Sequence, residues 1–436
     1  KDYRDTFTNF HAKKFNTPDS RCTRLHFFDA QIDAATIREA TKIQNSYLGY
    51  AVIRPTRPNC LGRTLLNPSG CGLQDAHIRL CSERVTIQGT ELSTSGFPFI
   101  SQDGDVTVCA QSALWMLVRY FSNRYSLYPE TYPYGLTSLV QDYSIGRIVP
   151  SGGLAVWQMA EAARQIGFAP LIYGRDRYPD FDHLMYTYVE SGIPVLAAFD
   201  GHVAILFGHR SDFSAAAGAI PAAGSSFVFS SQFNRAFIGN DDNGWPYQVL
   251  ENVAKPDGMI FPDQSVKPSY TISDVKQFIA PLPERVYLSA DKFQVLVTAL
   301  LGHAKYGYKV LSPQLSKVQP CLRLFLTSGR SYKKRLVTRG MGSPDVLEMY
   351  LNLPLPHFIW VCELSDVKLY PNRVLGEIIW DATRNEHEPN GWIALHYPEV
   401  LIVDAGSALN QGPRLLESAV ASATDYPIYE SNLERV

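Results

Sequence analysis

The strongest constraint on the fold of this 436-residue chain is a single change of apolar periodicity within residues 96–285. Apolar residues first recur at helical spacing over about 109–121, 154–166 and 181–190. Short apolar runs that are typical of strands follow at 195–199, 203–207, 226–229 and 236–239. Helical patterns that precede strand patterns predict an α+β fold in which helices pack on an antiparallel sheet.

The regions on either side of this segment have mixed patterns and no internal repeats. Their helical patterns lie at 34–43 and 292–301, and their strand patterns lie at 48–54, 84–92, 358–364, 374–380 and 393–403. The chain is long enough for two or three domains. We therefore expect an N-terminal mixed region at 1–95, a central α+β domain at 96–285, and a mixed α/β accessory domain at 286–436.

The composition limits the classes of partner. Hydrophobic residues make up 45% of the chain and charged residues 19%, which is an ordinary globular balance. A net charge of −2 gives no general attraction to nucleic acid, and the one basic run, 330–339, is typical of a solvated loop or strand face. No apolar run approaches the roughly 18–20 residues that span a bilayer. We therefore expect neither a nucleic-acid partner nor a membrane span.

The seven cysteines favour a reducing compartment. Their number is odd and no Cys-x-x-Cys pair occurs, which argues against a disulfide framework and against a structural zinc site. The cytoplasm is the simplest location. The chain begins at Lys1 without an initiator Met, however, which leaves a removed signal peptide open. Because buried free cysteines are common core residues, a catalytic cysteine must be identified from its surroundings.

Cys109 has the surroundings of a nucleophile. A polar, loop-like segment, 102–108, precedes it, and an apolar helical pattern begins at the cysteine itself. The N-terminus of a helix favours the thiolate, which is the reactive form of cysteine. None of the other six cysteines has a helical pattern beginning directly behind it. Helices that start at a cysteine are not rare, so this assignment requires partner residues.

A histidine and a cluster of carboxylates and amides are the candidate partners. His202 follows an Asp200-Gly201 turn and opens a predicted strand, where a base is held rigidly. The run Asn-Asp-Asp-Asn at 240–243 ends another predicted strand and offers a group that orients the far ring nitrogen of His202, as triads require. The alternatives are a histidine that closes a hairpin and an ordinary polar turn.

In their order and setting, Cys109, His202 and Asp241 resemble the papain-like cysteine peptidase superfamily, and most closely the bacterial C39-like peptidases. The matching features are the helix behind Cys109, a second helix that ends at Gly167, the run Gly192-Ile193-Pro194-Val195, the run from Gly201-His202 to Gly208, and Asn240-Asp241. The resemblance covers about residues 96–250. It implies a papain-like α+β fold and a cysteine hydrolase that cleaves a peptide, isopeptide or amide bond in a protein or peptide substrate.

The sequence departs from the family pattern at two places. The family's oxyanion-hole glutamine usually lies six positions before the cysteine, whereas Gln102 lies seven positions before Cys109. The proline that usually follows the acid is Asp242 here. The third catalytic residue is then Asp241, or Asn240 if the chain follows the asparagine of papain. We prefer Asp241, because an anion stabilises an imidazolium better than an amide does.

The resemblance implies acyl transfer through a thioester, with Cys109 as nucleophile, His202 as base, Asp241 as the orienting group, and Gln102 with the Cys109 backbone N–H around the oxyanion. It implies no metal and no organic cofactor, and the sequence has no glycine-rich phosphate loop, H-E-x-x-H or G-x-S-x-G motif.

Three alternatives remain. They are a papain-fold deamidase or acyltransferase, a catalytically inactive papain-like binding module, and a redox or metal-handling protein, which the scattered cysteines disfavour.

Overall fold

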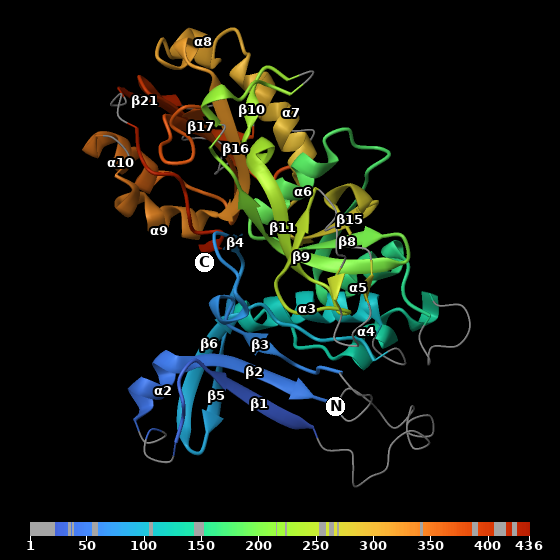
Figure 1. Ribbon diagram of the computed structural model, residues 1–436. Coiled ribbons are helices and arrows are strands. Elements are labelled where there is room, and N and C mark those ends of the chain that lie inside the picture. The colour runs from blue at the N-terminus through green and yellow to red at the C-terminus, as the bar shows by residue number, and fades with distance from the viewer. Residues whose placement is uncertain are drawn as a thin grey trace.

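The structure is a computed structural model of mixed α+β architecture with several antiparallel sheets (Figure 1). It describes residues 22–33, 36, 39–54, 60–103, 108–143, 152–214, 216–222, 225–252, 259–260, 266–267, 270–340, 343–385, 391–404, 416–420 and 425–436. No helix among these residues combines the length and the apolar character that a membrane crossing requires.

The α-helices are α2 (Ala40–Ser46), α3 (Cys109–Arg124), α4 (Pro133–Leu139), α5 (Val156–Ile166), α6 (Phe181–Glu190), α7 (Ala290–Leu301), α8 (Tyr308–Leu311), α9 (Gly329–Arg339) and α10 (Pro344–Asn352). The strands of the first 260 residues are β1 (Thr23–Phe28), β2 (Tyr47–Ile53), β3 (Leu65–Leu66), β4 (His77–Ile78), β5 (Cys81–Ile87), β6 (Thr90–Gly96), β7 (Phe168–Gly174), β8 (Val195–Phe199), β9 (His202–Ser211), β10 (Val228–Phe229), β11 (Asn234–Asn240), β12 (Gln248–Glu251) and β13 (Met259–Ile260). The later strands are β14 (Val266–Lys267), β15 (Gln277–Pro283), β16 (Pro320–Ser328), β17 (Phe358–Asp366), β18 (Gly376–Asp381), β19 (Trp392–Tyr397), β20 (Val400–Asp404), β21 (Leu416–Val420) and β22 (Glu434–Arg435).

The central sheet has the strand order β12-β11-β9-β8-β15-β7, and each of these pairings is antiparallel. Strands from both ends of the chain extend it, because β22 pairs with β4 and β4 pairs with β9. The approach of β4 requires a glycine at Gly208, where a Cβ atom would lie 2.5 Å from the His77 carbonyl oxygen. The predicted antiparallel sheet is thus confirmed, and it includes β7 and β15, which the sequence patterns missed.

The central sheet is buried on both faces. Along β8, Leu196 and Ala198 pack in the core that contains α3 and α5. The alternate residues Val195, Ala197 and Phe199 pack in the core that contains α6. Successive strand residues point to opposite faces, so a strand that is covered on both sides has a continuous apolar run.

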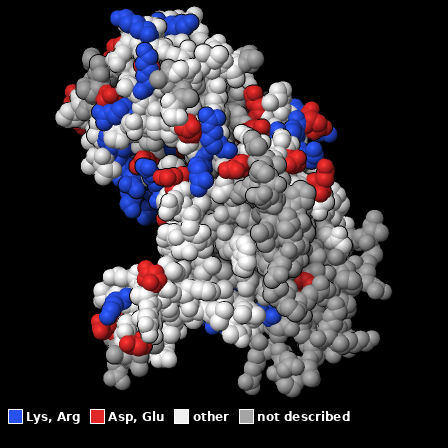
Figure 2. Space-filling model, in the orientation of Figure 1, with Lys and Arg blue, Asp and Glu red and all other residues white. Residues whose placement is uncertain are grey.

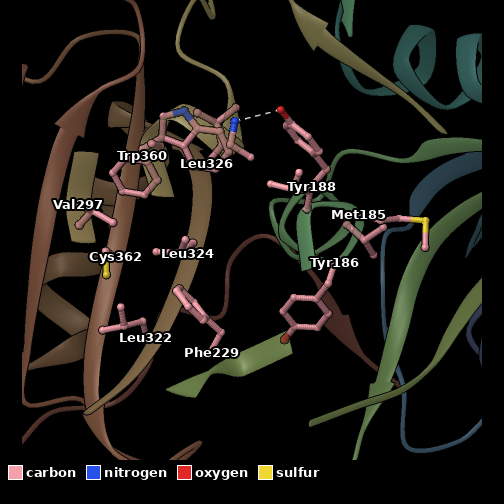
Figure 3. Close-up of a cluster of buried hydrophobic side chains, with 14 of the residues drawn as sticks. Met185, Tyr186, Tyr188, Phe229, Val297, Leu322, Leu324, Leu326, Trp360 and Cys362 are labelled. Atoms are coloured by element: carbon pink, nitrogen blue, oxygen red, sulfur yellow. Dashed lines mark hydrogen bonds between the residues drawn. The ribbon is translucent and has the colours of Figure 1, made fainter. Parts of the chain in front are cut away.

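A second sheet follows the order β10-β16-β17-β18-β19-β20-β21, and α6 lies between it and the central sheet (Figure 1). Figure 3 shows Met185, Tyr186 and Tyr188 of α6 opposite Leu324 and Trp360 of β16 and β17. The Tyr188 hydroxyl also accepts a hydrogen bond of 3.0 Å from the backbone N–H at the start of α7. Because α6 is buried nearly all round, it belongs to one core that is shared by the central and C-terminal regions.

A row of buried charges also joins the two sheets. The row alternates in sign through Glu190, Arg323, Glu363, Arg339 and Glu377, and the His209 imidazole contacts Glu190 at one end. The ion pairs that Glu363 forms with Arg323 and Arg339 each measure 2.7 Å. Removal of one member leaves a buried charge without its partner, which typically costs about 3–5 kcal/mol. His209 lies on β9, so this row ties the C-terminal region to the strand that begins at His202.

The three central helical patterns and most strand patterns are confirmed, but five predictions differ from the structure, four of them on individual elements. The single strands expected at 84–92 and 393–403 are hairpins, formed by β5 with β6 and by β19 with β20. The strand expected at 226–229 belongs to the second sheet, where it pairs in parallel with β16. The helix expected at 34–43 is described only in part, because 34–35 and 37–38 lie outside the described residues, and α2 continues beyond it to Ser46.

The basic run 330–339, expected as a solvated loop or strand face, forms most of α9 instead. Figure 2 shows Lys and Arg gathered on the surface of the C-terminal region where α9 lies, and Arg330, Lys334 and Arg335 are exposed. Arg339, at the end of the same helix, is buried in the row of charges. The basic residues of α9 therefore lie partly on the surface and partly in the buried row of charges.

Candidate active site

Cys109 is the first residue of α3, as predicted, and its side chain is partly exposed. The preceding residue, Val108, has an extended backbone and provides no side-chain cap, and the first turn of the helix contains no acidic residue. Among the described residues, α3 itself therefore contributes no acidic side chain to its own N-terminus. The next nine residues of α3 are all buried, which fixes the position of the cysteine.

His202 is positioned by a tight hairpin between β8 and β9. The turn consists of Asp200 and Gly201, and Gly201 has a φ of +70°, as the two-residue turns favoured in hairpins require. His202 pairs with Phe199 across the turn and is 9% exposed. The imidazole is thus held at the first position of a strand whose other residues are packed in the sheet.

Asp241 follows the end of β11, and its Oδ2 atom lies 3.0 Å from the Nε2 atom of His202. This contact does not meet the geometry of a well-formed hydrogen bond, so we describe it as a close pair of an imidazole and a carboxylate. Hydrogen-bond geometry of this loose kind is common in enzymes without substrate. The other ring nitrogen, Nδ1, is then the one available to Cys109.

A hydrogen bond between the Cys109 and His202 side chains completes this arrangement. Burial lowers the pKa of His202, but the hydrogen bonds with Asp241 and Cys109 and the charge of Asp241 together raise this pKa to about 10. His202 therefore holds both ring protons at neutral pH. The structure brings Cys109, His202 and Asp241 together from three different elements.

Asn240, the alternative third residue, does not contact His202 in this structure. Its side chain is fully buried and bonds to the backbone on both sides: the amide Nδ2 donates to the Pro98 carbonyl at 3.0 Å, and Oδ1 accepts from the Tyr247 N–H at 2.9 Å. Asn240 thus holds two chain segments together, and Asp241 is the residue placed against the imidazole.

Gln102 lies on the Asp241 side of the site. Its Nε2 amide donates a hydrogen bond to Oδ1 of Asn243, and the Asn243 backbone N–H donates to Oδ1 of Asp241 at 2.9 Å. The N-terminal region supports this segment, because Arg54 is paired with Asp103 at 3.4 Å. Residues 104–107, which connect Gln102 to the nucleophile, lie outside the described residues.

Two residues that the sequence reasoning missed also belong to the site. Asp242, considered only as a replacement for the family's proline, is 2% exposed. Burial and the neighbouring charge of Asp241 raise the pKa of Asp242 to about 7. The second is Tyr270, whose ring stacks on the His202 imidazole with centroids 5.6 Å apart and an interplanar angle of 11°. The double aspartate was a visible signal for the first, whereas nothing near Tyr270 in the sequence marked the second.

Replacement of Tyr270 by alanine is expected to slow alkylation of Cys109 by about 2- to 10-fold. Tyr270 also packs against Phe199 in a tilted arrangement, with centroids 4.4 Å apart, so it holds the imidazole from one face and shields it from water. Aromatic pairs of this kind contribute about 0.5–1.5 kcal/mol, which corresponds to such a factor. The measurement is the rate of Cys109 modification by iodoacetamide, followed by mass spectrometry.

Tyr270→Phe is the matched control for this prediction, because it keeps the ring and loses only the hydroxyl. We expect its rate to stay within about twofold of the wild type. An equal loss in both variants would assign the effect to the hydroxyl, and no change in Tyr270→Ala would show that the ring has no part in positioning His202.

Comparisons with models of protein families, with curated proteins and with solved structures find no match to this chain. The function is therefore inferred from the arrangement of the site residues.

Proposed function

We propose that this protein is a papain-like cysteine hydrolase that cleaves a peptide, isopeptide or amide bond in a protein or peptide substrate. The observation that carries the proposal is the convergence of a thiol, an imidazole and a carboxylate from α3, β9 and the end of β11. The thiol lies at a helix N-terminus, and the imidazole lies between it and a buried carboxylate. This is the order of groups that an activated cysteine nucleophile requires.

In the first half of the reaction, the Cys109 thiolate attacks the substrate carbonyl carbon. The backbone N–H of Cys109 and one amide N–H of Gln102 are the donors that we assign to the oxyanion. The Gln102 amide has two N–H groups, so it keeps its bond to Asn243 while it donates to the substrate. His202 then gives its Nδ1 proton to the leaving amine, the C–N bond breaks, and a thioester forms on Cys109.

The second half of the reaction regenerates the site. Neutral His202 takes a proton from water, and the resulting hydroxide attacks the thioester carbon. The carbon–sulfur bond breaks, the carboxylic acid product leaves, and the thiolate and the imidazolium are restored. Asp241 stabilises the imidazolium in both halves of the reaction.

Hydrolysis and acyl transfer differ only in the group that attacks the thioester. A deamidase uses water on a side-chain amide, and a transferase uses an amine. An inactive binding module, the remaining alternative, has no use for a buried carboxylate against the imidazole. The nature of the products therefore separates these functions.

The test is incubation of the protein with a peptide library prepared from a proteome, in the presence and absence of a primary amine. We expect peptides with new termini in the wild type and none with Cys109→Ala, both measured by mass spectrometry. Conversion of glutamine to glutamate without chain cleavage would make the protein a deamidase, and amine adducts would make it a transferase. No product at all from a protein whose Cys109 is reactive would contradict the proposal for peptide substrates.

A further inference from the structure

Asp242 is the group in the site that the proposed reaction leaves unused. Its side chain is 2% exposed, and its Oδ2 atom has no well-aligned hydrogen bond among the described residues, although the Ser112 hydroxyl lies beside the carboxyl. A buried carboxylate oxygen without a partner is energetically costly, and native proteins seldom keep one without a reason. The Nε2 atom of His202 is also buried and has no well-aligned hydrogen bond. Two buried ligand-type atoms that lack a well-aligned hydrogen bond thus lie close together.

These atoms have the spacing of metal ligands. One ligand atom from each of His202, Asp241 and Asp242 lies within 4.8 Å of the others, and all three side chains are buried. Zinc binds imidazole nitrogen and carboxylate oxygen at about 2.0–2.2 Å, so its ligand atoms lie roughly 3–4 Å apart. The His202 Nε2 and Asp241 Oδ2 atoms, at 3.0 Å, are already close to that separation. Small side-chain rotations suffice to close the set.

We propose that His202, Asp241 and Asp242 form a zinc site that switches the hydrolase off. Two carboxylates balance the charge of the ion, and the imidazole favours zinc over calcium or magnesium. The binding site stands on its own geometry, whereas its inhibitory effect rests on the proposed function. Three protein ligands leave a fourth zinc position for water.

Zinc inhibits in this site without touching the nucleophile. The ion replaces the proton on Nε2 of His202, which is released, and a histidine bound through Nε2 keeps its proton on Nδ1. The ring is then neutral and fixed by the metal. The ion turns the ring toward the two carboxylates, so the Cys109 side chain loses its hydrogen bond with His202. Zinc therefore lowers the rate of alkylation at Cys109 although no zinc–sulfur bond forms.

The first experiment measures zinc binding in the absence of the nucleophile. Isothermal titration of Cys109→Ala with zinc chloride is compared with titration of Cys109→Ala carrying Asp242→Asn. We expect one site in the first protein and at least about a tenfold weaker affinity in the second, because a ligand oxygen loses its charge. Asp345→Asn in the same background is the matched control, since Asp345 is exposed on α10, and it should bind as Cys109→Ala does.

The second experiment measures alkylation of Cys109 by iodoacetamide with zinc and with a chelator. Zinc should slow the reaction of the wild type, and the chelator should restore it. At a zinc concentration that saturates the wild type but lies well below the dissociation constant of the variant, Asp242→Asn should be slowed much less than the wild type. The readout is the ratio of the alkylation rate with zinc to the rate with the chelator. A merely structural effect of the substitution would change both rates and leave this ratio the same.

Three outcomes would contradict either the zinc site or the proposed function, and they distinguish the two. Equal zinc affinity with and without Asp242→Asn would remove the site. Zinc inhibition of the wild type without any binding to Cys109→Ala would assign the ion to the sulfur and also remove it. A Cys109 that is unreactive even with the chelator would contradict the proposed function, while zinc binding by Cys109→Ala would still decide the metal site.

Discussion

Cys109 is expected to react with iodoacetamide at neutral pH at least about tenfold faster than any other cysteine of the folded protein. Cys109 is the first residue of α3 and bonds to the His202 side chain. A helix N-terminus and a neighbouring imidazole are the surroundings in which cysteines are most reactive. Peptide mapping by mass spectrometry over a time course measures all seven rates in one sample.

The competing thiols differ in their exposure, which sharpens this test. Cys60, Cys81, Cys321 and Cys362 are buried and should be inert until the protein unfolds. Cys22 and Cys71 are exposed, but burial of the sulfur raises the pKa of Cys71 to about 11. Unfolded protein is the control, in which the seven rates should converge. A faster reaction at Cys22 or Cys321 with Cys109 inert would refute the assignment of the nucleophile.

Asp241→Asn is expected to lower both turnover and the alkylation rate of Cys109 by well over tenfold. By analogy with serine triads, in which replacement of the aspartate costs up to about 10⁴ in rate, the loss should be easy to measure. Asparagine keeps the shape of the side chain, and its Oδ1 can still accept the 2.9 Å bond from the Asn243 N–H. The free energy of unfolding should therefore change little, as measured by denaturant titration.

Asn240→Ala should have the opposite signature. It removes both bonds that the Asn240 side chain makes to the backbone at Pro98 and Tyr247, so a buried donor and a buried acceptor lose their partners. We expect the free energy of unfolding to fall by about 1–3 kcal/mol for each such group, with a much smaller effect on turnover than Asp241→Asn. A larger loss of turnover in Asn240→Ala than in Asp241→Asn would transfer the orienting role to Asn240.

The sequence alone predicted those elements whose signals are local. Helix α6 occurs at 181–190 as predicted, and α3 begins at Cys109, because apolar side chains at helical spacing mark the buried face of each helix. Strand β8 was recognised as a continuous apolar run, because both of its faces are buried. The Asp-Gly turn before His202 was also visible, since few residue pairs form a two-residue hairpin turn. These patterns suffice to place Cys109 and His202 on their elements.

The choice between Asn240 and Asp241 depended on the tertiary structure. Simple alternation along the strand gave no preference, and the pairing of β11 with β9 shifts register between Ile238 and Gly239. Such an irregularity changes which face each later residue occupies. Its position depends on how β11 fits against its neighbour, which no local pattern contains.

The tertiary structure also decided which charged and aromatic residues take part in the interior. Tyr270 reaches His202 from 68 positions further along the chain, and the stacking depends on the fold between them. Asp242 is a buried group of the site, and Arg339, which belongs to a basic run in the sequence, lies in the buried row of charges. Short-range periodicity reports which face of an element is apolar. The burial of a particular charge is set by the partners that distant segments bring to it, and only the folded chain brings them there.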